Sequence, residues 1–112
     1  MSNCNTSKRC GWPNELSAAM TGSPVLIGTL LFNPVMMIFD NQSTASVAIS
    51  VNDASGTNVW KTFTAGEALT IDMRSNHGIA DNFTADLGTN FYGNGAADGS
   101  FRISYIYASS TQ

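Results

Sequence analysis

The apolar residues of this chain recur with a period of two, and this pattern constrains the fold more than any other feature of the sequence. Apolar and polar side chains alternate over residues 47–51, 69–74 and 101–107. Such alternation indicates strands with one face in a core and the other outside it. Two nearly continuous apolar runs, residues 25–32 and 35–39, indicate strands that are buried on both faces. We therefore expect an all-β domain of about seven or eight short strands.

Clusters of turn residues separate these runs. Residues 52–56 predict a hairpin, and residues 93–99 predict a second hairpin turn in which Asn94 and Gly95 adopt positive φ. The last strand carries small or apolar side chains on its second face as well, which predicts a central place in its sheet. The pattern is typical of a single two-sheet β-sandwich, of jelly-roll or immunoglobulin-like type, over residues 24–112.

Residues 1–23 lack this alternation and predict an extended N-terminal arm. The segment is rich in Asn, Ser and Thr and is broken by Pro13. A short helical turn is possible from Asn14 to Met20, because Asn14 could cap it and the following residues tolerate a helix. Trp12 is a large apolar residue with little around it in sequence, so we expect it to pack on the domain or on another chain. Fully extended, the arm could span roughly 70 Å.

The low charge of the chain excludes several classes of protein. Charged residues make up 12% of the 112 residues, about half the usual share, and the net charge is −3. The cations are scattered and form no basic stripe that could neutralise phosphates, which argues against nucleic-acid binding; they are Lys8, Arg9, Lys61, Arg74 and Arg102. No apolar run approaches the length of about 18 residues needed for a membrane helix. The N-terminus has no apolar segment of the secretory type, so we expect synthesis in a cytosol and no membrane partner.

Few residues could carry catalysis or hold a metal. Cys4 and Cys10 supply two thiols, which could stay reduced or form a local disulfide, but a structural zinc site needs four ligands. His77 is the one histidine of the chain, and no nucleophile elbow or oxyanion hole accompanies it. Asp72, Asp81 and Asp86 do not have the spacing of a calcium loop. We expect no cofactor, no metal and no enzymatic activity.

Aromatic residues leave a second class of function open. Five of them could form a platform on which a sugar ring stacks, or could belong to the core, as aromatics at alternating strand positions usually do; they are Trp60, Phe91, Tyr92, Tyr105 and Tyr107. A carbohydrate-binding module for host attachment is therefore the alternative to an assembly protein.

Four segments of the chain together resemble small virion structural proteins of tailed bacteriophages. They are Phe39-Asp40-Asn41-Gln42, residues 60–69 from Trp60 through Lys61-Thr62-Phe63 to Ala68-Leu69, Arg74-Ser75-Asn76-His77-Gly78, and Ser104-Tyr105-Ile106-Tyr107. The resemblance covers roughly residues 25–108. It implies a non-enzymatic β-sandwich in the virion, made in the host bacterial cytoplasm, that serves as a capsid decoration or cement protein or as a head-to-tail connector component.

The resemblance also implies partners. These are the major capsid protein or connector and portal-associated subunits, together with further copies of this chain as a homo-oligomer in the particle. Assembly interfaces are depleted in Lys, Glu and Asp and enriched in aromatic residues, Met and Arg, which agrees with the low charge of this sequence. We expect contacts with neighbours at Trp12 in the arm, at His77 in a loop, and at Met20 and Arg74.

Overall fold

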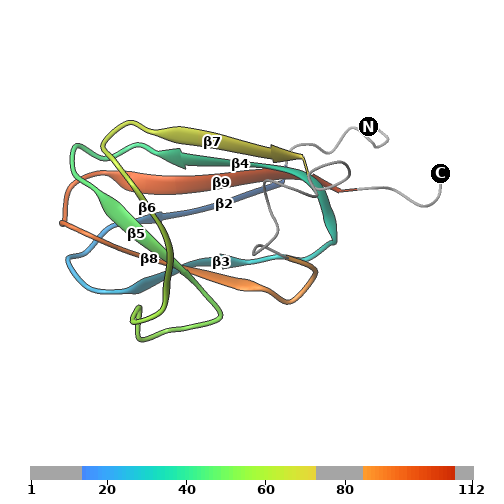
Figure 1. Cartoon of the computed structure of the whole chain (residues 1–112), viewed down its shortest axis with the longest axis horizontal. Helices are drawn as coiled ribbons and strands as arrows, with labels where there is room; N and C mark the ends of the chain where they lie inside the picture. The colour runs from blue at the N-terminus through green and yellow to red at the C-terminus, as the bar shows by residue number, and fades with distance from the viewer. Residues whose placement is uncertain (1–13, 73–84, 108–112) are drawn as a thin grey trace.

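The computed structural model describes residues 14–72 and 85–107, and these residues form eight strands and no helix. The strands are β2 (Asn14–Ala19), β3 (Val25–Thr29), β4 (Pro34–Asn41), β5 (Val47–Val51), β6 (Val59–Phe63), β7 (Ala68–Asp72), β8 (Asn90–Gly95) and β9 (Ser100–Tyr107). They make two four-stranded antiparallel sheets, ordered β2-β9-β4-β7 and β3-β8-β5-β6. Figure 1 shows the sheets as two layers. The prediction of an all-β, two-sheet architecture is confirmed.

The space between the two sheets is filled by the apolar side chains that alternate with polar ones along the strands. Along β9, Phe101, Ile103 and Tyr105 are buried and alternate with half-buried residues. Phe39 of β4 lies at the centre of an aromatic cluster, with ring centroids 5.9 Å from Phe63 and 5.7 Å from Phe91. Aromatic burial of this kind supplies much of the hydrophobic stabilisation of a small domain.

Two local predictions are confirmed by the strand pairing. Residues 52–56 lie in the connection from β5 to β6, which spans residues 52–58, and these two strands pair antiparallel as a hairpin. Strand β9 lies between β2 and β4, as its apolar second face predicted.

The prediction of a hairpin turn at residues 93–99 is wrong. Strands β8 and β9, which flank this turn, belong to different sheets, so the chain crosses from one layer to the other. Gly93, Asn94 and Gly95 are still part of β8, and the positive φ is found at Gly99 (φ 87°) instead. Local sequence favours a turn here, but it does not determine which strand pairs with which.

Part of the predicted arm also needs correction. Asn14–Ala19 forms strand β2 rather than a helical turn, and it pairs in continuous register with β9 from Asn14 opposite Tyr105 to Ala19 opposite Ser100. Leu16 and Ala18 pack against the core. Residues 14–19 are therefore an edge strand of the sandwich, and residues 1–13 lie outside the described residues.

Candidate docking surface

The residues predicted to touch partners fall into two groups. Trp12, Arg74 and His77 lie outside the described residues. Met20 is a core residue that is only 3% exposed, and its side chain lies beside the backbone of Gly93 and Gly95. The prediction that Met20 contacts a partner is therefore corrected: Met20 seals the end of the core behind β2.

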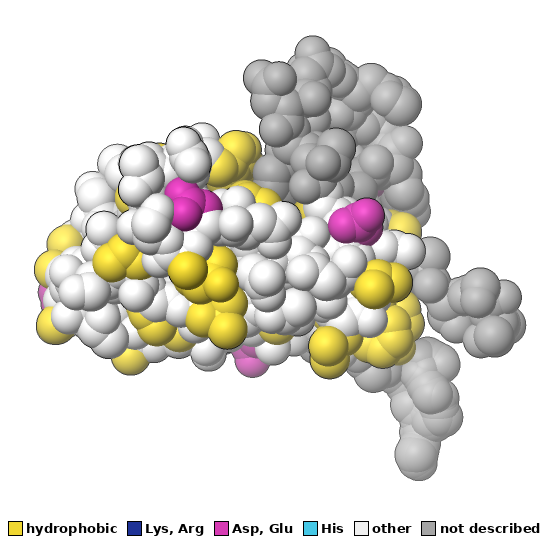
Figure 2. Space-filling model, turned by 90° about the horizontal axis from the view of Figure 1, so that it is seen from below, with side chains coloured by type: hydrophobic (Ala, Val, Ile, Leu, Met, Phe, Trp, Pro, Cys, Tyr) yellow, Lys and Arg dark blue, Asp and Glu magenta, His cyan; other side chains and the backbone are white. Residues whose placement is uncertain are grey.

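Three large apolar side chains are exposed together at one end of the sandwich. They are Leu31 (70% exposed), Phe32 (39%) and Leu87 (61%), which we call the end patch. Leu31 and Phe32 lie in the connection from β3 to β4, and Leu87 lies in the turn before β8. In Figure 2 hydrophobic side chains are spread along the whole face, and some of them lie at the right-hand end, which in Figure 1 is the end where β2 begins and β9 stops.

Hydrogen bonds join the segments of the end patch to each other. The Leu87 N–H donates to Asn33 Oδ1 (2.8 Å), and the Gly88 N–H donates to the Leu30 carbonyl (2.8 Å). The Leu31 N–H donates to the hydroxyl of Tyr105 (3.0 Å), which is otherwise buried in the core. The end patch is thus a fixed surface, because its backbone is tied to both sheets.

An aromatic pair extends the end patch toward β9. The rings of Phe32 and Tyr107 are stacked with centroids 4.0 Å apart and planes 12° from parallel. This stack positions the half-exposed Phe32 ring beside the last residue of β9. Exposed apolar groups that gather in this way, rather than singly, mark interaction surfaces.

The described residues carry a net negative charge. Among the described residues there are seven carboxylates and two cations, so their net charge is 2 − 7 = −5. Both cations are in ion pairs: Lys61 with Glu67 (3.1 Å), and Arg102 with Glu15 (3.1 Å) and Asp40 (3.4 Å). Asp and Glu are the only charged side chains visible in Figure 2 among the described residues. One of the carboxylates, Asp86, directly precedes Leu87 of the end patch.

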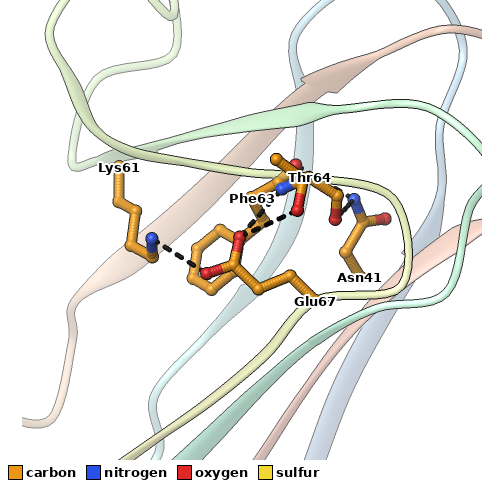
Figure 3. Close-up of polar contacts among 5 residues, drawn as sticks. All are labelled: Asn41, Lys61, Phe63, Thr64 and Glu67. Atoms are coloured by element: carbon orange, nitrogen blue, oxygen red, sulfur yellow. Dashed lines mark hydrogen bonds and ion pairs between the residues drawn. The ribbon is translucent and has the colours of Figure 1, made fainter.

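The opposite end of the sandwich is held by a buried amide. Asn41, at the end of β4, is fully buried, and its Nδ2 lies 3.0 Å from the Ala45 carbonyl, 3.1 Å from that of Phe63 and 2.9 Å from that of Thr64. Its Oδ1 accepts from the N–H (3.0 Å) and hydroxyl (2.7 Å) of Ser43. Figure 3 shows Asn41 beside the turn that follows β6. This amide fastens the β4–β5 connection to the β6–β7 connection, and its role is structural.

A surface ion pair completes the β6–β7 turn. The Thr64 N–H donates to Glu67 Oε1 (2.9 Å), and Lys61 Nζ lies 3.1 Å from Glu67 Oε2 and 4.9 Å from the centroid of the Phe63 ring (Figure 3). The hydrogen bond from Thr64 and the nearby Lys61 ammonium lower the pKa of Glu67 below its ordinary value of 4.5.

This pKa shift predicts a pH dependence of stability. Because the folded-state pKa lies below the unfolded one, ionised Glu67 stabilises the fold above pH 4.5, and the contribution is lost as the pH falls through the folded-state pKa. We expect Glu67→Gln to lower the urea midpoint at neutral pH and to approach the wild-type midpoint in acid. A difference between the two proteins that stays constant over this pH range would contradict the assignment.

The aromatic residues considered for sugar stacking do not share a surface. Phe91 and Tyr105 are buried, and Trp60 packs against the core, where its ring centroid lies 5.2 Å from that of Phe39. Tyr92 and Tyr107 are half-buried on strands of different sheets. The platform of five aromatic side chains that the sequence left open is therefore not formed.

The described residues also show no metal centre and no membrane-spanning helix. In residues 14–72 and 85–107, no three His, Cys, Asp or Glu side chains gather closely enough to hold a metal ion. None of these residues forms a helix long and apolar enough to cross a membrane. The chain matches no protein-family model, no curated protein and no solved structure.

The end patch was not predicted from the sequence. Leu31 and Phe32 were expected in a buried strand over residues 25–32, but β3 ends at Thr29. The available signal was the Asn33-Pro34 break, because a strand that approaches such a break must leave the sheet before it. No pattern in the sequence pointed to Leu87, which is brought to the end patch by tertiary hydrogen bonds.

Proposed function

We propose that this chain is a non-enzymatic structural protein of a bacteriophage virion, either a capsid decoration or cement protein or a head-to-tail assembly component, that binds neighbouring virion subunits. It would be made in the host bacterial cytoplasm and act in the particle. The order in which the strands pair supports the proposal, and the exposed end patch favours protein over carbohydrate as the partner.

The strand pairs are nested one inside another along the chain. Strand β2 pairs with β9, β3 with β8, β4 with β7 and β5 with β6. A long antiparallel hairpin that is rolled into two sheets has this nesting, so we assign the sandwich to the jelly-roll type. An immunoglobulin-like sandwich keeps its first two strands in one sheet, whereas β2 and β3 are in different sheets.

The jelly-roll assignment leaves two functional classes in view. Jelly rolls are common in viral capsid proteins and in lectins, and a fold alone does not select between them. The exposed apolar end patch favours binding to protein, because carbohydrate sites need aromatic faces combined with polar groups that hold the sugar hydroxyls. The alternative, a carbohydrate-binding module for host attachment, predicts that the isolated protein selects particular sugars on a glycan array.

The experiment that tests the proposal is incorporation into particles. We expect mass spectrometry of gradient-purified virions of the phage that encodes the chain to detect it at a fixed ratio to the major capsid protein. We expect a variant that lacks residues 2–12 to be incorporated less, since the arm supplies part of the contact. The deletion must stop before Asn14, because a longer one removes β2 and the core residue Met20. Absence of the wild-type chain from purified particles would overturn the proposal.

A further inference from the structure

The end patch combines exposed apolar groups with a carboxylate that pairs with no cation of the described residues. Leu31 and Leu87 are the two most exposed large apolar side chains of the described residues. Asp86 is exposed beside Leu87 and is in no ion pair with either described cation, because both are paired elsewhere. An occupant of this surface should therefore bring an apolar side chain together with cations.

Residues 1–13 of the chain have this chemistry. They contain Lys8, Arg9 and no acidic residue, and Trp12 is their large apolar side chain. They are attached at the right place as well. The first residue of β2, Asn14, is paired with Tyr105, whose hydroxyl accepts the hydrogen bond from the Leu31 N–H.

We infer that two copies of the chain pair about a two-fold axis, each laying residues 1–13 on the end patch of the other. In this arrangement Trp12 covers Leu31 and Leu87, and Lys8 and Arg9 lie near Asp86. The inference rests on the proposed assembly function and names one contact of it, the contact between copies. A two-fold pair uses the same two surfaces twice and closes on itself.

Chain direction favours a second copy over the chain's own patch. Pro13 fixes its own φ near −65° and biases Trp12 toward an extended conformation. Trp12 should therefore continue along the direction of β2, off the end of the sandwich, instead of turning back onto Leu31 of its own chain. Twelve extended residues reach up to about 40 Å, which is enough to cross to a neighbour.

Charge explains why the arms are needed. Two end patches in direct contact would bring two Asp86 carboxylates and two net-negative domains together, which costs free energy. Reciprocal arms place two lysines and two arginines between the domains. The association should accordingly weaken as salt is raised.

The test is the oligomeric state of the full chain in solution, measured by sedimentation over a wide concentration range with a reductant present, so that Cys4 and Cys10 cannot cross-link copies. We expect a reversible dimer. Leu87→Asp and Trp12→Ala each alter both symmetric contacts of the dimer. Each altered contact should raise the dimer dissociation constant about tenfold, so either variant should raise it about a hundredfold. The matched control is Leu26→Asp, which alters a leucine that is 47% exposed near the start of β3 and should leave the dimer constant unchanged.

Mixing the two variants separates an arm on a neighbour from an arm on its own chain. A Trp12→Ala chain keeps an intact patch and a Leu87→Asp chain keeps an intact arm, so their mixed dimer has one undamaged contact. The other contact lacks both Trp12 and Leu87, but these side chains touch each other in the proposed arrangement, so their joint loss weakens that contact by about tenfold, as a single loss does. We expect this mixed dimer to be about tenfold tighter than either variant alone. No gain on mixing would show that the arm binds its own chain, and it would overturn the inference.

Other outcomes also decide the matter. A wild-type chain that stays monomeric, or a Leu26→Asp variant as weak as Leu87→Asp, would overturn the inference. If the chain is incorporated into virions while it stays monomeric, the proposed function stands and the paired-arm contact fails. If it dimerises as described but is absent from virions, the contact stands and the proposed function fails.

Discussion

Replacing Asn41 with Leu should cost about 3–5 kcal/mol of unfolding free energy. The leucine side chain is apolar and larger than that of asparagine, and it would leave the Phe63 carbonyl and the Ser43 N–H buried without their present partner and the part-buried Thr64 carbonyl without its own. Each buried polar group that loses its hydrogen bond costs about 1–3 kcal/mol. That loss is a large part of the roughly 5–15 kcal/mol by which a small domain is stable. Urea unfolding followed by circular dichroism measures it.

Asn41→Asp separates the loss of the amide from the loss of shape. The aspartate is nearly isosteric, but it brings an acceptor oxygen close to three carbonyl oxygens, so burial and repulsion should raise its pKa above the ordinary value of about 3.9. With the folded-state pKa above the unfolded one, the protonated form is favoured in the fold, and the variant loses stability as the pH rises through about 4 and above. We expect the Asp variant to be less stable at neutral pH than in mild acid. Wild-type stability in either variant would refute the structural role of Asn41.

The sheet content of this fold could be predicted from sequence because burial imposes its own period. The alternation over residues 47–51 and 101–107 corresponds to β5 and β9, and the turn residues 52–56 correctly predicted the hairpin of β5 and β6. These features are local. A strand with one buried face must alternate, and a short polar turn between two such strands favours their pairing.

The connections between sheets could not be predicted in the same way. Residues 93–99 have the composition of a hairpin turn, yet they lead from β8 in one sheet to β9 in the other. Strand β2, with the sequence Asn-Glu-Leu-Ser-Ala-Ala, has little strand propensity, and it becomes a strand because β9 offers a free edge. In both cases the outcome depends on which edges and faces remain open after the rest of the chain has packed.

The candidate site was predicted poorly for a related reason. Met20 was expected at an interface from its residue type, but the small glycines of β8 leave room for its side chain in the core. Leu31 and Leu87 were not expected at a surface, since apolar residues are assigned to the core by default. Whether an apolar side chain is exposed depends on the tertiary structure. Here the exposed side chains come together because the β3–β4 connection and the turn before β8, which are far apart in sequence, lie side by side.

Replacing Gly99 with Ala should be strongly destabilising because two separate costs coincide at this residue. Gly99 has φ 87°, where residues with a Cβ are strained by about 1–2 kcal/mol. A Cβ there would also lie 2.6 Å from Ser43 Cα and 3.0 Å from the Gln42 carbonyl oxygen, in the connection that Asn41 holds. Backbone cannot move aside as a flexible side chain can, so overpacking adds about 1–3 kcal/mol. We expect a total loss of about 3 kcal/mol in urea unfolding.

Gly66→Ala is the matched control, because this residue also has a positive φ but an added Cβ would not collide with neighbouring atoms. Gly66 has φ 75°, but a Cβ at this position would meet no atom within 4 Å. Its substitution should therefore cost only the conformational part, about 1 kcal/mol. The difference between the two variants then measures how closely the β8–β9 connection packs on the β4–β5 connection. Equal losses for Gly66→Ala and Gly99→Ala would mean that the β8–β9 and β4–β5 connections are not in close contact. That result would contradict the packing of these two connections at this end of the sandwich.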